Sequence, residues 1–198
     1  MHLFGAYGER VKGNVRLSDK PFEQGNPQQA IERGLVLVSE DRRRYGLVLE
    51  HDVGFNLSLA SLEQFCTAGV LNQQRETSAN QAQFDSLRIK ATGLEATAGK
   101  LSGGNQQKIV LGKALMTEPQ VIMLDEPTRG IDVGAKIEIY EIINRLTSEG
   151  KAVLLVSSEL PELIGMSDRI VMLNHGRVGG EFTRAEATQE KLMAAAMG

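Results

Sequence analysis

The sequence of 198 residues has one cysteine, no long apolar run and no excess of basic side chains. Cys66 alone cannot form an internal disulfide, and apolar runs such as 152–156 fall far short of the roughly 20 residues of a membrane-spanning helix. The net charge of −3 gives no general electrostatic reason to expect nucleic acid as a partner. The first five residues lack the charged and apolar regions of a signal peptide. We therefore expect a reducing cytoplasm and no direct insertion into a membrane.

Hydrophobic residues make up 41% of the chain and charged residues 24%, without repeats or low-complexity tracts. This composition is that of a globular protein, and the length fits one domain with or without a small subdomain. The basic run Arg42–Arg44 is short, so we interpret it as solvated surface; contact with a transmembrane partner or with phosphate is the alternative. Cys66 is expected to be a small buried apolar residue. His51 and His175 have no partners at metal-ligand spacing and are interpreted as turn or surface residues.

The first half of the chain predicts two strands and a helical block. Residues 13–17 favour a strand, and Asn26 followed by Pro27 predicts the start of a helix that ends before Gly34. A buried-type strand over 35–38 then leads into a polar loop, 39–46, which we interpret as a functional surface. Residues from about 53 to 92 indicate helices, the longest over 73–91, and few strand signals. We expect a helical subdomain there.

From Lys100 onward, strands and helices alternate. The pattern predicts helices over 104–116, 133–148 and 186–197, strands over 121–124, 152–156 and 169–173, a short helix opened by Pro161, and a turn over 174–177. Alternation implies a parallel sheet with right-handed crossovers. Strands 121–124 and 152–156 are apolar at every position, as expected of central strands covered on both faces. The expected fold class is α/β, with a mostly parallel sheet and a helical subdomain.

Asp125 and Glu126 follow the predicted strand 121–124, at the edge where ligands of such sheets bind. Alternation along an extended strand would point the two carboxylates in different directions. In nucleoside triphosphatases of the P-loop class, such an aspartate holds Mg²⁺ directly or through water, and a neighbouring carboxylate orients and deprotonates the attacking water. A solvated strand end followed by a proline turn is the open alternative.

The stretch KLSGGNQQKIVLGKAL, residues 100–115, places a serine and two glycines at the start of a predicted helix. The glycines let the backbone approach a phosphate, Ser102 can donate a hydrogen bond, and the helix dipole favours an anion by roughly 0.3–1 kcal/mol. Such a contribution can discriminate between ligands that differ by one phosphate. It cannot hold a phosphate ligand tightly by itself, because about 1.4 kcal/mol is one decade of affinity.

LSGGNQQ at 101–107 and LDEPTRGID at 124–132 together resemble the signature, Walker B and D-loop motifs of ABC-type ATPases. With GLVLVSEDRRRYGLVLEHDVGFNLSL at 34–59 and VSSELPELIGMSDRIVML at 156–173, the chain resembles the second ATP-binding half of the tandem ATPase subunit of ribose, galactose, arabinose and xylose importers. Among these importers, the amino-acid sequence of residues 35–59 most resembles the xylose type. The resemblance implies a partial P-loop NTPase fold: a core and glutamine-loop remnant over 1–52, a helical subdomain over 53–99, and an α/β core over 100–198.

The resemblance also implies the site residues and the cofactors, ATP and Mg²⁺. The residues that it makes catalytic are Asp125, which would hold Mg²⁺ through water, Glu126 and Ser158. The residues that it makes cofactor-binding are Ser102, Gly103, Gly104, Gln106, Glu40 and Asp132. Two of these depart from the general pattern: Glu40 stands where most ABC ATPases have glutamine, and Ser158 stands where they have the switch histidine. Serine carries no positive charge toward a phosphate, which lowers the activity expected of this half's own site.

The motif G-x-x-x-x-G-K-[ST] of a P-loop does not occur in the sequence. The nearest stretch, 93–101, is one residue too long and ends in leucine, so we interpret it as a loop before the signature. By resemblance, the P-loop belongs just upstream of residues 3–8, which look like the end of the helix that follows it. We therefore expect a carboxyl-terminal remnant of a longer subunit. Without the P-loop strand, the isolated chain is expected to be marginally stable and prone to aggregate.

Three functions follow from these expectations. The first is part of the ATP-hydrolysing subunit of a carbohydrate importer at the cytoplasmic face of the inner membrane. Its partners would be the first nucleotide-binding half or a second copy, transmembrane permease subunits and, indirectly, a periplasmic sugar-binding protein. The second is a non-catalytic interaction module that contributes a signature surface and binds no nucleotide alone. The third, a soluble ABC ATPase acting on DNA or ribosomes, is disfavoured by the acidic pI near 5.7.

Overall fold

A computed structural model describes residues 13–23 and 26–197. The chain divides into two compact units, Met1–Leu154 and Leu155–Gly198, and each is described by itself. The helix end expected at residues 3–8 lies outside the described residues. The division into 1–52, 53–99 and 100–198 remains a prediction. Within the described part of the chain, the helices are too short or too polar to cross a membrane.

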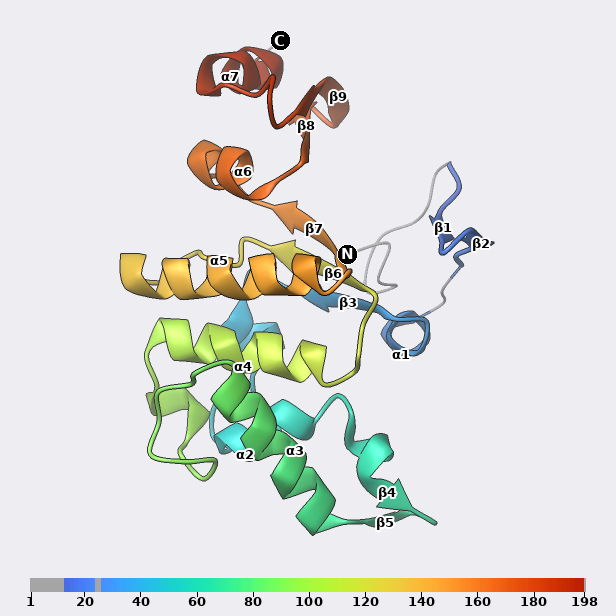
Figure 1. The fold of residues 1–198 in the computed structure, drawn as a ribbon, viewed down its shortest axis with the longest axis vertical. Coiled ribbons are helices and arrows are strands. Elements are labelled where there is room, and N and C mark those ends of the chain that lie inside the picture. The colour runs from blue at the N-terminus through green and yellow to red at the C-terminus, as the bar shows by residue number, and fades with distance from the viewer. Residues whose placement is uncertain (1–12, 24–25, 198) are drawn as a thin grey trace. The chain divides into compact units, whose positions relative to one another are not determined.

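A three-stranded sheet forms the centre of the first unit (Figure 1). Its strands are β3 (Leu35–Val38), β6 (Val121–Asp125) and β7 (Ala152–Val156), in the order β3-β6-β7. β3 and β6 run parallel, with Val38 opposite Leu124, so their carboxyl ends share one edge. Both residues are almost fully buried. The parallel sheet predicted from the sequence is therefore confirmed.

The strand β7 differs from the prediction that both of its faces are covered. The Leu154 side chain, which belongs to the first unit, is 50% exposed, whereas Ile122 and Leu124 in β6 are buried. The reason is position: among the described residues β7 ends the strand order and β6 lies in the middle. An all-apolar strand thus stands at the edge of the described sheet.

Helices surround this sheet near the predicted positions. α1 (Pro27–Glu32) begins where Asn26 Oδ1 accepts a hydrogen bond from the Gln29 amide over 2.9 Å, and α1 packs beside β3. α4 (Gly103–Leu115) and α5 (Val133–Ser148) pack against each other. α4 also contacts β3, α2 (Val53–Ser58) and α3 (Gln73–Ser86), so it joins the sheet to the helical block (Figure 1).

The helical block contains a hairpin that the sequence analysis missed. β4 (Cys66–Thr67) and β5 (Val70–Leu71) follow the 3-10 turn η3 (Leu62–Phe65) and pair antiparallel. Ala68 and Gly69 have φ values of 50° and 80°, which give the tight reversal of a two-residue hairpin loop. Cys66 lies on this short strand and is exposed, so the expectation that it is buried is wrong.

α3 is shorter than predicted because a buried turn follows it. The helix ends at Ser86 rather than near residue 91. Leu87 and Ile89 are both buried, and Arg88 between them has a φ of +50°, which a right-handed helix cannot contain. The chain leaves the helix so that both apolar side chains reach the core.

The predicted strand over 13–17 is present as β1 (Arg16–Leu17), and it pairs with a strand that the sequence analysis missed, β2 (Lys20–Pro21). Phe22 directly after them packs in a small core with Ala30 and Leu35.

The second unit holds α6 (Leu160–Met166), the antiparallel strands β8 (Arg169–Asn174) and β9 (Arg177–Thr183), and α7 (Gln189–Met197). The predicted turn is confirmed, with φ of 46° at His175 and 76° at Gly176. Leu163, Ile170 and Leu192 form the core of this unit.

Candidate functional site

Asp125 is the last residue of β6, and the chain turns at Glu126. Glu126 has a φ of +48°, so it is not extended, and the predicted alternation of the two carboxylates along a strand is wrong. The turn is closed by the Arg129 amide, which donates to the Glu126 carbonyl oxygen over 3.1 Å. A left-handed backbone is unfavourable for a residue with a Cβ and occurs where the surrounding structure fixes it.

The turn continues through Gly130, which has a φ of +67°, to Asp132 at the start of α5. The Asp132 carboxylate accepts a hydrogen bond from the Ala135 amide over 2.9 Å and caps the helix. Residues 126–132, called the D-loop segment below, are therefore fixed at both ends.

Ser102 is the N-cap of α4. Its Oγ accepts hydrogen bonds from the Asn105 amide over 3.5 Å and from Asn105 Nδ2 over 3.0 Å. Because the oxygen is the acceptor in both bonds, the hydroxyl hydrogen is left to donate to a ligand. The amides of Gly103 and Gly104 stand in the first turn, where a helix supplies no acceptor, and that turn contains no acidic residue. The donor set at this helix end suits an anion.

The two glycines of this turn are also required for packing. A Cβ on Gly103 would lie 2.7 Å from Arg42 Nη2 and 3.1 Å from the Gly130 carbonyl oxygen, and a Cβ on Gly104 would overlap the Ala135 Cβ. The start of α4 thus lies directly against the D-loop segment and the first turn of α5. The structure brings together Ser102, Gly103 and Gly104 with the segment that ends at Asp132.

Gln106 is buried and holds the preceding loop rather than facing solvent. Its Nε2 lies 3.3, 3.4 and 3.1 Å from the carbonyl oxygens of Ala98, Gly99 and Leu101. Its assignment to a cofactor stays a prediction. Asn105, which the sequence analysis passed over, orients Ser102 and accepts a bond from the Lys90 amide over 2.8 Å. An amide side chain three residues after a capping serine is the signal that could have identified it.

Glu40 and Arg42 lie on the segment after β3, and both reach the D-loop segment. Glu40 forms an ion pair with Arg129, and both side chains are substantially exposed. Arg42 opens a single π-helical turn, η2 (Arg42–Gly46), and donates from Nη1 to the Arg129 carbonyl oxygen over 2.9 Å. The expectation of a solvated arginine surface holds for Arg43 and Arg44 but is wrong for Arg42, which is half-buried. Burial lowers the pKa of the Arg42 guanidinium.

A buried lysine holds α4 to α5 beyond residues 102–105, which are called the signature turn below. Lys108 is 1% exposed, and its Nζ lies 2.6 Å from Glu138 Oε2 and 2.8 Å from the Arg88 carbonyl oxygen. Lys90 pairs with the other carboxylate oxygen of Glu138 over 2.8 Å. The hydrogen bonds from Lys108 and Lys90 lower the pKa of Glu138 to about 2. The sequence analysis did not identify this cluster, since its members come from separate segments.

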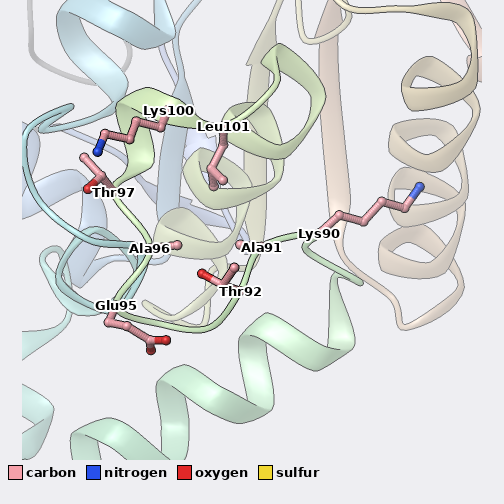
Figure 2. Close-up of a pocket in the computed structure, with 8 residues that line it drawn as sticks. All are labelled: Lys90, Ala91, Thr92, Glu95, Ala96, Thr97, Lys100 and Leu101. Atoms are coloured by element: carbon pink, nitrogen blue, oxygen red, sulfur yellow. The ribbon is translucent and has the colours of Figure 1, made fainter.

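The stretch 93–101 forms a loop with one 3-10 turn, η4 (Ala98–Lys100), as expected. A pocket of about 690 Å³ lies along it, and Figure 2 shows its lining residues. Lys90 and Lys100 lie on opposite sides of this pocket with their ammonium groups directed apart (Figure 2). These two ammonium groups therefore do not converge on one point in the pocket.

Ser158 belongs to the second unit, in the connection between β7 and α6. Glu159 there donates its amide to Ser157 Oγ over 3.0 Å. The structure thus groups most of the predicted site residues in the first unit and Ser158 in the second. In the part of the chain that the structure describes, no three His, Cys, Asp or Glu side chains cluster as metal ligands would.

The sequence is similar to two curated proteins named xylose import ATP-binding protein XylG. It is 53% identical over 196 residues to that of Moorella thermoacetica and 50% identical over 196 residues to that of Geobacillus kaustophilus. In each case the match covers 99% of this chain and 39% of the relative. The chain therefore spans about two fifths of the length of these relatives.

Solved structures share the fold. A nucleotide-free ATP-binding cassette of an ABC transporter gives a TM-score of 0.81 at 18% identity, covering 100% of this chain and 81% of that one. A dimeric ATP-binding cassette bound to ADP and Pi gives 0.75 at 19% identity, covering 92% and 78%. The fold is that of the P-loop NTPases of the ABC class. A family model described as ABC transporter matches residues 2–129. Since this match covers more than half of the sequence, the chain belongs to the ABC transporter family.

Proposed function

We propose that this chain is part of the ATP-hydrolysing subunit of an ABC carbohydrate importer and supplies a signature motif and a Walker B strand. The observation that carries the proposal is the start of α4, where exposed Ser102 keeps a hydroxyl hydrogen to donate and the two glycines after it lie close against the D-loop segment and α5. The relatives named as xylose importers support a pentose as the transported sugar.

The start of α4 fits the terminal phosphate of ATP. Ser102 would donate its hydroxyl hydrogen, and Gly103 and Gly104 would donate amides while the helix dipole favours the anion. In this assignment Gln106 supports the turn from behind, through the carbonyl oxygens that it binds. Because the chain has no P-loop motif, the phosphates would be held mainly by another segment: an upstream part of the same subunit, its first half or a second copy.

Asp125 and Glu126 fit the second half of the assignment. Mg²⁺ commonly keeps several waters and binds through one or two carboxylates plus phosphate oxygens, so one strand-end aspartate is an adequate protein contribution. Asp125 would hold the ion through water, and Glu126 would orient and deprotonate the attacking water. Glu40, Asp132 and Ser158 would complete the nucleotide surface.

The serine at position 158 would make the two nucleotide sites of the subunit unequal in activity. Ser158 cannot place a positive charge on the phosphate as a histidine can, whereas Ser102 and its glycines are intact. We infer that this half completes a competent site whose P-loop lies elsewhere and that its own site is slower. The division into 1–52, 53–99 and 100–198 would then separate the glutamine-loop remnant, the helical subdomain and the signature core.

The partners would be the transmembrane permease subunits, which a periplasmic sugar-binding protein supplies with sugar. The chain would act at the cytoplasmic face of the inner membrane. A non-catalytic interaction module is the second candidate, favoured for the isolated chain by the absence of a P-loop motif from the sequence.

The deciding experiment is calorimetric titration of Mg-ATP into the isolated chain and into the full subunit that contains it. We expect no detectable binding by the isolated chain and micromolar binding with steady hydrolysis by the full subunit. Binding by both would mean that residues other than a P-loop form the phosphate site. Binding by neither would overturn the proposal in favour of the interaction module.

A further inference from the structure

Arg42 stands apart from its two neighbours in the basic run. Arg43 and Arg44 are exposed, whereas Arg42 is half-buried and its Nε is fully buried without a hydrogen-bond partner. Burying a guanidinium is unfavourable unless its other donors bond well. Arg42 meets this condition through Nη1 and Nη2, which donate to the carbonyl oxygens of Arg129 over 2.9 Å and Gly130 over 3.3 Å.

The Arg42 guanidinium also touches the signature turn. A Cβ on Gly103 would lie 2.7 Å from Arg42 Nη2 and 3.1 Å from the Gly130 carbonyl oxygen. The guanidinium and the Gly130 carbonyl therefore occupy the space that a side chain at residue 103 would need. Three segments meet at this point: the turn after β3, the D-loop segment and the start of α4.

The other end of η2 is fastened to α4 as well. A Cβ on Gly46 would lie 2.8 Å from Val110 Cγ2 and 3.4 Å from Arg42 Cβ, and Lys113 Nζ donates to the Gly46 carbonyl oxygen. Burial lowers the pKa of this lysine. η2 is thus held at both ends along one helix, and close-packed contacts of this kind transmit displacement instead of absorbing it.

A second contact joins the same two segments, with the charged donor now in the D-loop segment. The Glu40 carboxylate, two residues before Arg42, pairs with the Arg129 side chain, whose own carbonyl oxygen accepts from Arg42. The segment after β3 and the D-loop segment therefore each give a charged group to the other.

We propose that Arg42 is a positioning residue that couples the segment after β3 to the D-loop segment and the signature turn. Its role is to keep Ser102 and Asp132 in the relative placement that a bound phosphate requires, so that a shift of residues 40–46 changes both together. This inference rests on the function proposed above. Arg42 itself contacts no nucleotide, and its effect passes through Gly103 and Gly130.

The test compares Arg42→Ala, Arg42→Lys and the matched control Arg43→Ala, which removes the same charge from an exposed neighbour. Hydrogen–deuterium exchange of residues 126–135 and steady-state hydrolysis are measured in the full subunit. The amides of Arg129 and Ala135 report on the segment because both donate within it. We expect local exchange at least about tenfold faster in Arg42→Ala, the factor for one charge-assisted hydrogen bond.

For hydrolysis, we expect kcat of Arg42→Ala to fall about three- to thirtyfold with KM for Mg-ATP unchanged. Arg42→Lys keeps the charge without the fork and should recover part of kcat. Arg43→Ala should match the wild type in both measurements.

Two results would overturn the proposal: equal kcat in Arg42→Ala and Arg43→Ala, or a general rise in exchange over the whole fold with no recovery in Arg42→Lys. The latter would reduce Arg42 to a purely structural residue. If the wild-type subunit fails to hydrolyse ATP while Arg42→Ala still exchanges faster at 126–135, the proposed function falls and the link between the segments stands.

Discussion

Glu126, the residue proposed to deprotonate the attacking water, has an unfavourable backbone conformation. Its φ of +48° places it in the left-handed region, where a non-glycine residue costs about 1–2 kcal/mol. Asp125, in contrast, ends a regular strand. The direction of the Glu126 carboxylate therefore depends on this turn and not on the alternation of side chains along a strand.

Replacing Glu126 by Gln should abolish most hydrolysis at this half's own site while Mg-ATP still binds, and turnover is measured in a full subunit whose other site has been inactivated. The amide keeps the shape of the side chain but cannot take a proton, so we expect a loss of about 10²- to 10⁴-fold in kcat. Glu118→Gln is the matched control, because Glu118 is an exposed glutamate with a φ of +53°. Turnover of Glu126→Gln near the wild-type rate would refute the assignment.

Ser102 caps α4 and is proposed to bind a phosphate, and different substitutions separate these two roles. Ser102→Ala loses the cap and should destabilise the protein by about 1 kcal/mol in urea unfolding, as well as impair hydrolysis. Ser102→Asp keeps a good cap and should unfold like the wild type, yet its charge should repel the phosphate and impair turnover more than alanine does. Ser102→Thr retains both functions. Unimpaired turnover in Ser102→Asp would show that no phosphate approaches this helix end.

At the level of elements, α4 and α5 approach each other through a glycine. A Cβ on Gly104 would overlap the Ala135 Cβ. Gly104→Ala should therefore destabilise the protein by about 1–3 kcal/mol, as overpacking does, and push the signature turn from the D-loop segment.

The control is Gly165→Ala, a helical glycine in α6 with open space around its would-be Cβ, which should be neutral or slightly stabilising. Adding Ala135→Gly should rescue Gly104→Ala in chemical unfolding. A Gly104→Ala variant as stable as the wild type would contradict the close approach.

The Lys108–Glu138 pair should make the α4–α5 contact sensitive to acid. The pKa of Glu138 is lowered from 4.5 to about 2, so the folded state favours the ionised form. The stabilising contribution is complete above pH 4.5 and is lost as the pH falls through the interval down to about 2.

Urea unfolding at several pH values checks this expectation. Glu138→Gln should lower the free energy of unfolding by about 1–3 kcal/mol near neutral pH, because Lys108 stays buried with a weaker partner. It should also reduce the loss of stability that the wild type shows as the pH falls below 4.5. Glu141→Gln, in an exposed pair with Arg88, should change neither quantity much. If Glu138→Gln loses stability below pH 4.5 as the wild type does, the Lys108–Glu138 pair is not the cause of the acid sensitivity.

For the whole molecule, the exposed apolar side chains should determine whether the isolated chain self-associates. Val133 and Ile137, one turn apart on α5, are 75% and 53% exposed, and Leu154 on β7 is 50% exposed. Exposed apolar side chains of this kind favour association.

The isolated chain should therefore self-associate, with a mass in sedimentation that rises with concentration, and melt without a sharp transition. Val133→Thr combined with Ile137→Thr should lower the association, whereas Val70→Thr on the β4–β5 hairpin should not. A cooperative melt of a soluble monomer would contradict this expectation.

Much of the molecule follows from local sequence. The apolar run of β6 and the Asn26 cap with Pro27 each depend on neighbours within a few residues, so the sequence predicts them. The segments 101–107 and 124–132, which resemble signature and Walker B motifs, likewise indicate the family, because their order and separation are properties of the chain alone.

Contacts between segments far apart in the chain could not be predicted from the sequence. Arg42 read as part of a solvated run, since its partners are more than 80 residues away in the chain. The buried Lys108 needed Glu138 across a helix interface, and the exposure of β7 depended on its place in the strand order. Helix caps and apolar runs are decided by local backbone geometry and the hydrophobic effect. Burial of a charge is decided only when the tertiary fold brings its partner within bonding distance.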